Sequence, residues 1–219
     1  MKVVALIPIK LINVRLPGKN TMNLSGRPLC DYLFKTIAGI DEIDEKYVYC
    51  SDPAITDYIP QELKFLQRDS CLDAPDVKGI EIYKSFANAV EADVYILTHV
   101  TSPFLRASSL VAAIKKLRNE GYDSAFAAQE IKEFSWFNGE PLNYGFEDVV
   151  LTQDLKPVFV ETSGFYMFKR DILLVHGRRI GFNPYMHIVD GYEAVDIDTK
   201  DDFNFAQVVV KHLSDKEGA

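Results

Sequence analysis

Apolar runs alternate with amphipathic stretches over the first 130 residues. Residues 3–9 (VVALIPI) are continuously apolar and rich in β-branched side chains, which is typical of a strand covered on both faces. Residues 29–40 space their apolar side chains at the helical period instead. The same criteria predict strands at 47–50, 63–66, 93–99, 124–128, 158–168 and 194–197, and helices at 80–90, 108–119, 170–176 and 201–213.

This alternation predicts an α/β fold. Strands and helices that follow one another form βαβ units, so we expect three layers around a mostly parallel sheet. Ligands of such sheets bind at the carboxyl ends of the strands, where the strand order reverses. Residues 134–156 are rich in aromatic, glycine, asparagine and acidic residues and predict an excursion from the core. We therefore expect one domain over residues 1–219 with a protruding segment at 134–156.

Composition narrows the class of protein. No apolar run in the 219 residues approaches the length of a membrane span, so no membrane partner is expected. Three cysteines without a C-x-x-C pair favour reduced thiols and a cytoplasmic location. The net charge of −8 argues against a nucleic-acid partner. Residues 1–30, however, contain five cations and no acid, which is compatible with a small, highly charged anion bound at one basic loop.

The basic loop follows the first predicted strand. Lys10, Arg15 and Lys19 lie within residues 8–20, beside Pro17 and Gly18. A triphosphate requires such cations, because its anionic oxygens repel an attacking nucleophile until their charge is offset. Neither a Walker A motif nor G-x-G-x-x-G is present, which disfavours kinase-like and dinucleotide-binding proteins. A solvated surface loop with ordinary lysines is the alternative interpretation.

Two aspartates near the C-terminus are candidates for a metal site. Asp196 and Asp198 are two residues apart, so on a strand both carboxylates would face the same side. Their mutual repulsion would be relieved by Mg²⁺, which takes one or two carboxylates and completes its shell with water and phosphates. The alternative is that one of them caps the helix beginning near residue 201. His99 has no serine or cysteine nucleophile motif nearby, and a hydrogen-bonded structural histidine is its commoner role.

The ordered set of motifs resembles one enzyme family. Six segments carry the resemblance: the basic loop, L-S-G-R-P-L at 24–29, Ser51-Asp52, T-S-P-F-L-R at 101–106, Q-D-L-K-P-V-F-V at 153–160, and D-I-D-T at 196–199. In this order they are similar to the acylneuraminate cytidylyltransferases (CMP-sialic acid synthetases) and their CMP-Kdo synthetase relatives. The resemblance covers roughly residues 1–212. It implies a Rossmann-like nucleotidyltransferase domain whose protruding segment mediates homodimer formation.

The resemblance also implies a reaction. CMP is transferred from CTP to the anomeric hydroxyl of a sialic-acid-like 2-keto-3-deoxy sugar with eight or nine carbons, and pyrophosphate is released. The implied catalytic residues that hold the triphosphate are Lys10, Arg15 and Lys19. The implied nucleotide-binding residues are Asn20, Arg68 and Ser102, and the implied sugar-binding residues are His99, Gln153 and Tyr166. The implied ligands of the cofactor Mg²⁺ are Asp196 and Asp198.

The sequence departs from the family at both ends of the site. Leu11-Ile12-Asn13 replaces a small G-G-S stretch, Lys10 replaces an arginine, and His99 replaces a glutamine. Arg15-Leu16-Pro17-Gly18-Lys19 favours the CMP-Kdo branch, whereas Thr101-Ser102-Pro103 and Asp196-x-Asp198 favour the sialic acid branch. Two alternatives therefore stay open: a CMP-Kdo-type or other sugar nucleotidyltransferase, and a catalytically inactive nucleotide-binding relative.

Overall fold

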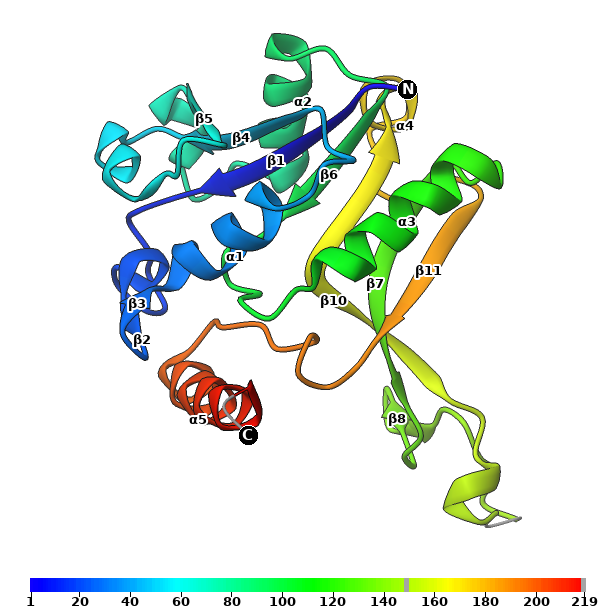
Figure 1. Cartoon of the computed structure of the whole chain (residues 1–219). Helices are drawn as coiled ribbons and strands as arrows, with labels where there is room; N and C mark the ends of the chain where they lie inside the picture. The colour runs from blue at the N-terminus through cyan, green and yellow to red at the C-terminus, as the bar shows by residue number, and fades with distance from the viewer. Residues whose placement is uncertain (148–149, 218–219) are drawn as a thin grey trace.

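The computed structural model describes residues 1–147 and 150–217 of the chain. In these residues a seven-stranded mixed sheet lies between two helical layers, with a C-terminal helix and a protruding arm outside them (Figure 1). The strands of the sheet are β1 (Val3–Ile9), β4 (Glu45–Cys50), β5 (Lys64–Gln67), β6 (Val94–Thr98), β7 (Ser124–Ile131), β10 (Val158–Lys169) and β11 (Pro184–Val189). The α-helices are α1 (Leu29–Ala38), α2 (Gly79–Ala89), α3 (Ala107–Asn119), α4 (Arg170–Leu174) and α5 (Lys200–Glu217). The predicted three-layer α/β fold is confirmed.

The strand order reverses at β1 in the middle of the sheet. The order across the sheet is β11-β7-β10-β6-β1-β4-β5, so the chain first builds outward from β1 to β5 and then returns to β6 on the other side. All neighbouring strands are parallel except β10, which runs antiparallel to both β6 and β7. The loops after β1 and β6 therefore emerge side by side at the switch point, where ligands of α/β sheets bind.

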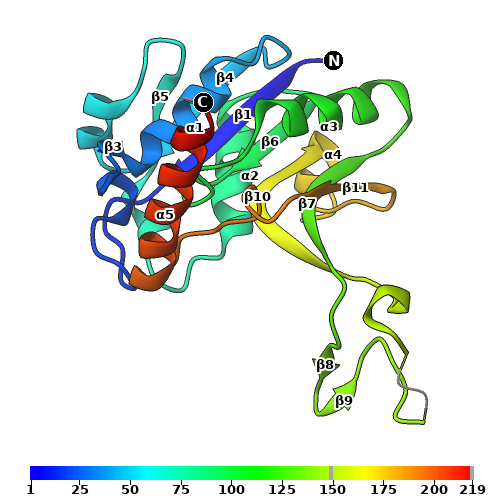
Figure 2. The ribbon, with the colours of Figure 1, turned by 60° about the horizontal axis from the view of Figure 1, so that its bottom comes forward.

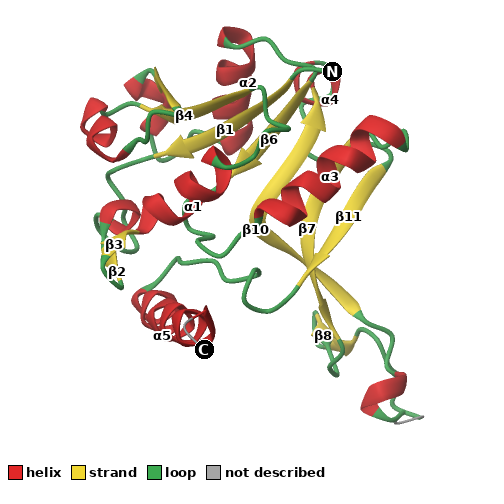
Figure 3. Ribbon diagram, viewed as in Figure 1, coloured by secondary structure: helices red, strands yellow, loops and turns green. Residues whose placement is uncertain are grey.

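Apolar side chains cover both faces of the sheet. On one face, α1 and α3 bury Phe34 and Ile114 against β1 and β6, and on the other, α2 and α4 bury Phe86 and Leu173. Central strands covered on both faces need apolar residues at nearly every position, which is why β1 reads as an unbroken apolar run. Figure 3 shows the two helical layers with the sheet between them. None of the helices within the described ranges has the length and apolarity that crossing a membrane requires.

One predicted strand is wrong, and one strand of the seven-stranded sheet was not predicted. Residues 194–197 are not a strand; Val195 and Ile197 pack with α5 in a third apolar cluster, and the amide of Ile197 donates to the carbonyl of Thr101 at 2.8 Å. The last strand of the sheet is β11, at one edge and parallel to β7. Its polar and half-exposed positions, with a proline at the start, do not read as a buried strand.

The predicted excursion is an arm that projects from the domain (Figure 2). It contains the short hairpin β8 (Trp136–Phe137) and β9 (Glu140–Pro141) and the 3₁₀ turn η4 (Thr152–Asp154). Its aromatic side chains pack on one another, with ring centroids of Phe134 and Tyr144 4.9 Å apart, and stay largely exposed. Positions 148–149 of the excursion lie outside the described residues.

Five further short elements lie in the loops of the domain. The hairpin strands β2 (Asn23–Leu24) and β3 (Arg27–Pro28) lead into α1, and the 3₁₀ turns η1 (Lys19–Thr21), η2 (Pro53–Tyr58) and η3 (Ser70–Asp73) close the loops after β1, β4 and β5. The sequence analysis did not predict these elements, because two to six residues are too few to show a period.

Candidate active site

The loop after β1 is organised around the carbonyl oxygen of Lys10. The side-chain amides of Asn13 and Asn20 both donate to this oxygen, at 3.1 and 2.8 Å. Gly18 adopts a left-handed conformation (φ 67°), which turns the chain so that Lys19 enters the buried η1 turn. The loop thus has a defined shape and encloses a cavity of about 200 Å³ lined by Lys10, Arg15 and Lys19, among others.

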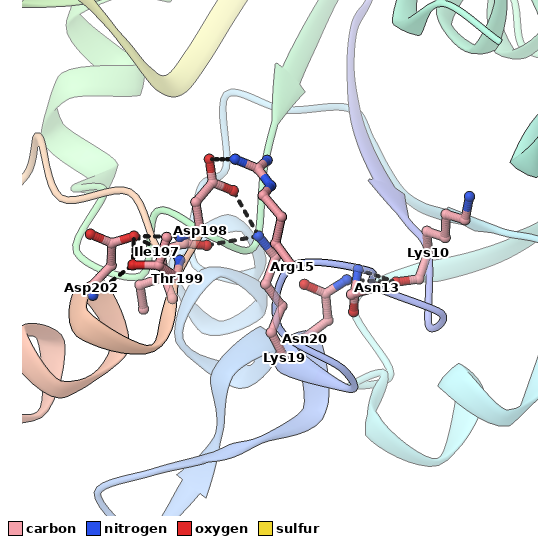
Figure 4. Close-up of polar contacts among 9 residues, drawn as sticks. All are labelled: Lys10, Asn13, Arg15, Lys19, Asn20, Ile197, Asp198, Thr199 and Asp202. Carbon is pink, nitrogen blue, oxygen red and sulfur yellow. Dashed lines mark hydrogen bonds and ion pairs between the residues drawn. The ribbon is translucent and has the colours of Figure 1, made fainter. Parts of the chain in front are cut away.

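Arg15 and Lys19 converge on Asp198, as Figure 4 shows. Arg15 Nη1 is 2.7 Å from one carboxylate oxygen of Asp198, and Lys19 Nζ is 2.9 Å from the other. Lys19 also donates to the carbonyl of Ile197 at 2.8 Å, and its side chain is only 9% exposed. Burial acts to raise the pKa of Asp198, but hydrogen bonding to Lys19 and the charges of Lys19 and Arg15 outweigh it, so the pKa lies below its ordinary value.

The segment that carries Asp196 and Asp198 is held by polar contacts on its N-terminal side and by apolar packing within the segment. On the N-terminal side, Glu193 is buried and accepts a hydrogen bond from the amide of Arg106 at 3.0 Å, and Arg106 pairs with Asp190. Beyond these polar anchors, Val195 and Ile197 are buried in the third apolar cluster while the alternate positions Asp196 and Asp198 remain partly exposed. The two carboxylates are therefore presented on the side away from that cluster, although the backbone is not a strand.

The helix after these aspartates is capped by other residues. Asp202 Oδ2 accepts hydrogen bonds from the amides of Asp198 and Thr199 at 3.0 and 2.7 Å, and the amide of Asp202 donates to Thr199 Oγ1 at 3.3 Å. This reciprocal arrangement is a capping box at the start of α5. The capping alternative for Asp196 and Asp198 is thus wrong.

The pair of aspartates suits a hard divalent cation. One oxygen of Asp196, Oδ1, is buried without a hydrogen-bond partner, and such an oxygen favours a bound cation. Among the described residues no cluster of three or more histidine, cysteine or acidic side chains could enclose a metal. Two carboxylates without a third protein ligand fit Mg²⁺, which keeps waters and substrate phosphates in its shell.

Arg68 lies on the other side of the loop and is almost completely buried. Its guanidinium donates to the carbonyls of Ile9 and Tyr49, at 3.0 and 3.2 Å, and pairs with Asp73. Asp73 in turn accepts a hydrogen bond from Ser51, and its carbonyl accepts one from Lys10 Nζ. This network holds together the ends of β1, β4 and β5. It lines a cavity that extends to Tyr83 and His99. The volume of this cavity, about 320 Å³, is at the lower end of the range for small-molecule sites.

His99 directly follows β6, at the carboxyl end of that strand, and contacts the neighbouring strand β10. Its Nδ1 is 3.0 Å from the carbonyl oxygen of Ser163 in β10, so Nδ1 is the protonated nitrogen and Nε2 is left as an acceptor. Burial lowers the pKa of His99, and the charges of Arg179 and Lys19 act in the same direction. The imidazole is therefore neutral at pH 7.

Tyr166 lies in β10, the strand next to β6, opposite Leu97. It is buried in β10, and its hydroxyl donates to Glu161 at 2.9 Å. The guanidinium of Arg179 lies over its ring at 3.9 Å. Burial raises the pKa of Tyr166, so the hydroxyl stays protonated. Glu161 and Arg179, together with Asp73 and Glu193, were not singled out from the sequence, because no motif surrounds them and only the fold brings them to the candidate site.

Two predicted site residues lie apart from the others. Ser102 is buried in the turn after β6, where its amide donates to the carbonyl of His99 at 3.0 Å, and it lines neither of the two cavities described above. Gln153 is exposed in η4 on the arm, which Figure 1 shows to project away from the carboxyl ends of β1 and β6. A larger cavity of about 720 Å³ lies at the opposite end of the sheet, beside Met1 and Arg170, and contains none of the predicted residues.

The chain is similar in sequence to known cytidylyltransferases. The chain is 24% identical to an N-acylneuraminate cytidylyltransferase of Streptococcus agalactiae serotype V, over 93% of this chain and 52% of that protein. It is also 24% identical to 3-deoxy-manno-octulosonate cytidylyltransferase 2 of Hydrogenovibrio crunogenus, over 81% of this chain and 68% of that protein. The chain thus spans about half the length of the Streptococcus relative.

Solved structures share the fold. A CMP:2-keto-3-deoxy-manno-octonic acid synthetase complexed with CTP superposes with a TM-score of 0.76 at 17% identity, covering 97% of this chain and 99% of that one. A 4-diphosphocytidyl-2C-methyl-D-erythritol synthase from Anaerococcus prevotii gives 0.68 at 12% identity, covering 96% and 98%. These similarities establish the architecture.

The sequence profile described as Cytidylyltransferase matches residues 4–212. This match covers nearly all of the sheet, the basic loop and both aspartates, and it agrees with the resemblance drawn from the motifs. The chain belongs to the cytidylyltransferase family.

Proposed function

We propose that this chain transfers CMP from CTP to the anomeric hydroxyl of an acidic 2-keto-3-deoxy sugar, with release of pyrophosphate. One observation carries the proposal: Arg15 and Lys19, which line the cavity of the loop after β1, both pair with Asp198. Cations and carboxylates that face one another at this position suit a metal–triphosphate complex. The names of the two relatives, both of which are cytidylyltransferases of acidic keto sugars, support the substrate class.

The basic loop would bind the triphosphate. Lys10, Arg15 and Lys19 line the loop cavity, and their charges would stabilise the charge that develops on departing pyrophosphate. The side chain of Arg15 is 68% exposed, so it can exchange Asp198 for a phosphate without giving up a buried contact. Lys19 is held on Ile197 and Asp198 and would position the phosphate that it meets.

Asp196 and Asp198 would hold Mg²⁺. When bound, this ion supplies positive charge that lowers the repulsion between the triphosphate and an attacking hydroxyl. The unpartnered oxygen of Asp196 and the half-exposed carboxylate of Asp198 are the donors available to it.

The nucleoside and the sugar would occupy the cavity on either side of His99. Asn20, Arg68 and Ser102 are proposed for the nucleotide, with Arg68 acting through the shape of the cavity wall because its guanidinium bonds to protein carbonyls. His99 and Tyr166 are proposed for the sugar, and Nε2 of His99 would accept a hydrogen bond from a sugar hydroxyl. No covalent enzyme intermediate is needed for this reaction.

The arm is proposed as a homodimer interface. Trp136, Phe137 and Phe146 are more than half exposed, and large aromatic residues concentrate at protein interfaces. Gln153 lies on this arm, so it would reach a sugar only in the site of a partner subunit. Sedimentation of the protein and of a Trp136→Ser variant tests this proposal: dimer is expected for the first and monomer for the second, and a monomeric parent protein would contradict it.

Pyrophosphate release in the presence of CTP, Mg²⁺ and either N-acetylneuraminate or Kdo tests the activity and identifies the sugar. Asp198→Asn is expected to lower kcat by about 10²- to 10³-fold while changing CTP affinity little, because it removes charge that acts in the transition state. The matched control is Asp201→Asn, on an exposed residue in the first turn of α5. Near-normal turnover of Asp198→Asn would overturn the metal assignment. A flat response to both sugars, with CTP still raising the melting temperature, would favour an inactive nucleotide-binding relative.

A further inference from the structure

One cation near the proposed sugar-binding residues, Arg179, takes no part in the proposed contacts with the triphosphate and the metal. Arg179 lies between α4 and β11, and the carbon at the centre of its guanidinium is 3.9 Å from the centre of the Tyr166 ring. Its Nη2 is 3.4 Å from Oε2 of Glu161, the same oxygen that accepts the Tyr166 hydroxyl at 2.9 Å. Stacking and a hydrogen bond together fix where the guanidinium lies.

The guanidinium is held in place but not saturated. An arginine offers five N–H donors, and within the described residues Arg179 makes one hydrogen bond within 3.5 Å, the long one to Glu161, beside a weaker side-chain interaction with Tyr83. Its side chain is 42% exposed. A planar, oriented guanidinium with free donors is the usual partner of a carboxylate, which it binds through two parallel hydrogen bonds.

The charge of Arg179 acts on the residues around the sugar end of the cavity. Burial raises the pKa of both Tyr83 and Tyr166, and the positive charge of Arg179 opposes this rise in each. The same charge adds to the effect of burial in lowering the pKa of His99. Tyr83 and His99 line the 320 Å³ cavity, so the field of Arg179 extends into the space where the sugar would bind.

The preceding residue, Arg178, is an arginine on the surface and serves as a comparison for Arg179. Arg178 is exposed; it lies over the ring of Phe182 at 4.8 Å and donates to the carbonyl of Gly181 at 3.3 Å. These two contacts of its side chain are with residues that follow it closely in the chain. Arg179, one position later, instead contacts two residues of β10 that lie more than ten positions away. The two side chains have the same chemistry and different surroundings, which makes them a matched pair.

We propose that Arg179 binds the carboxylate of the acceptor sugar and so selects acidic keto sugars over neutral ones. This inference rests on the proposed function and names the group that determines its acceptor. Glu161 holds one edge of the guanidinium and offsets part of its charge, and Tyr166 supports its face, while the remaining N–H groups receive the carboxylate. Arg179 is thus a specificity-determining residue rather than one of the groups that act on the phosphates.

Two measurements test the proposal on the full chain. The first is steady-state pyrophosphate release with CTP, Mg²⁺ and the preferred sugar acid, or the methyl ester of that sugar acid. Arg179→Gln is expected to raise the acceptor KM by about 30-fold, the worth of hydrogen bonds to a charged group, and to leave the KM for CTP unchanged. The preference of the parent protein for the acid over its ester should be lost in the same variant. Arg178→Gln should match the parent protein in every respect.

The second measurement is calorimetric titration of N-acetylneuraminate and of Kdo into the protein with CTP and EDTA, where no turnover occurs. Weaker binding to Arg179→Gln, with normal binding to Arg178→Gln, supports the proposal even if the parent protein shows no turnover, in which case only the proposed function fails. Turnover with an unchanged acceptor KM in Arg179→Gln overturns the proposal and leaves the proposed function standing. Absence of sugar binding and turnover in the parent protein overturns both.

Discussion

Two arginines of the candidate site, Arg68 and Arg179, differ more than their identical chemistry suggests. Arg68, on the proposed nucleotide side, is 2% exposed and bonds to two backbone carbonyls and Asp73. Arg179, on the proposed sugar side, is 42% exposed and makes one long hydrogen bond. The first residue ties three strands together, whereas the second keeps most of its donors free.

This difference extends to the surrounding regions. Around the basic loop, Lys10, Asn20 and Lys19 all bond to the protein itself, so the nucleotide side has its shape before a ligand arrives. On the sugar side, a half-exposed ion pair between Glu161 and Arg179 and a histidine with one free nitrogen leave the acceptor contacts open. The proposed nucleotide side is therefore preorganised, which suits binding of CTP. The proposed sugar side keeps hydrogen-bonding groups free, which suits binding of different acceptor sugars.

The largest effect is expected from the nucleotide side. Lys19→Met should lower kcat by about 10³-fold, because it removes a nearly buried charge that is proposed to position the phosphates and leaves Asp198 with Arg15 alone. Pyrophosphate release measures this loss. The control is Lys35→Met, on the exposed face of α1, which should retain full activity. Equal activity of the two variants would show that the loop does not act on the triphosphate.

Arg68→Met should be the most destabilising of the arginine substitutions. It leaves Asp73 without its cation and the carbonyls of Ile9 and Tyr49 without a donor, at a cost of about 3 kcal/mol in the free energy of unfolding. Urea denaturation measures the change. A loss below about 1 kcal/mol would mean that Arg68 serves the ligand and not the strands.

Stability should depend on pH through His99. Because its pKa is lowered in the folded protein, the unfolded chain binds a proton at a higher pH than the folded one does, and stability is lost as pH falls below about 6.5. His99→Gln should flatten this part of the curve, by at most about 1.4 kcal/mol per pH unit, the slope of a single proton. Melting temperatures between pH 7.5 and 5 measure it, and parallel curves for the two proteins would refute the effect. His187, whose pKa burial also lowers, accounts for some of the remaining slope.

The smallest effect on stability is expected on the sugar side. Arg179→Gln should change the free energy of unfolding by less than about 0.5 kcal/mol, because a half-exposed ion pair contributes little. The same urea experiment as for Arg68→Met measures it. A loss as large as that of Arg68→Met would remove the contrast between the two arginines and assign Arg179 a structural role.

Much of the fold followed from local patterns. The apolar run of β1 and the helical periods of α1 and α3 are strong signals, and these elements lie within a few residues of their predicted bounds. The edge strand β11 was missed, since one of its faces is open and its side chains need not be apolar. Residues 194–197 have the alternation of a strand but cover α5 instead of joining the sheet, and alternation alone cannot distinguish these cases.

The sequence by itself determined the family, the basic loop and the two aspartates, because these are chemical groups at short, fixed spacings. Only the tertiary structure decided which charges meet. Arg15 and Asp198 are 183 positions apart and Arg68 and Ile9 are 59 apart, and the pairing of Arg179 with Tyr166 depends on where β10 lies in the sheet. Such contacts leave no local pattern, since their energies depend on burial and distance in the folded chain and not on neighbours in sequence.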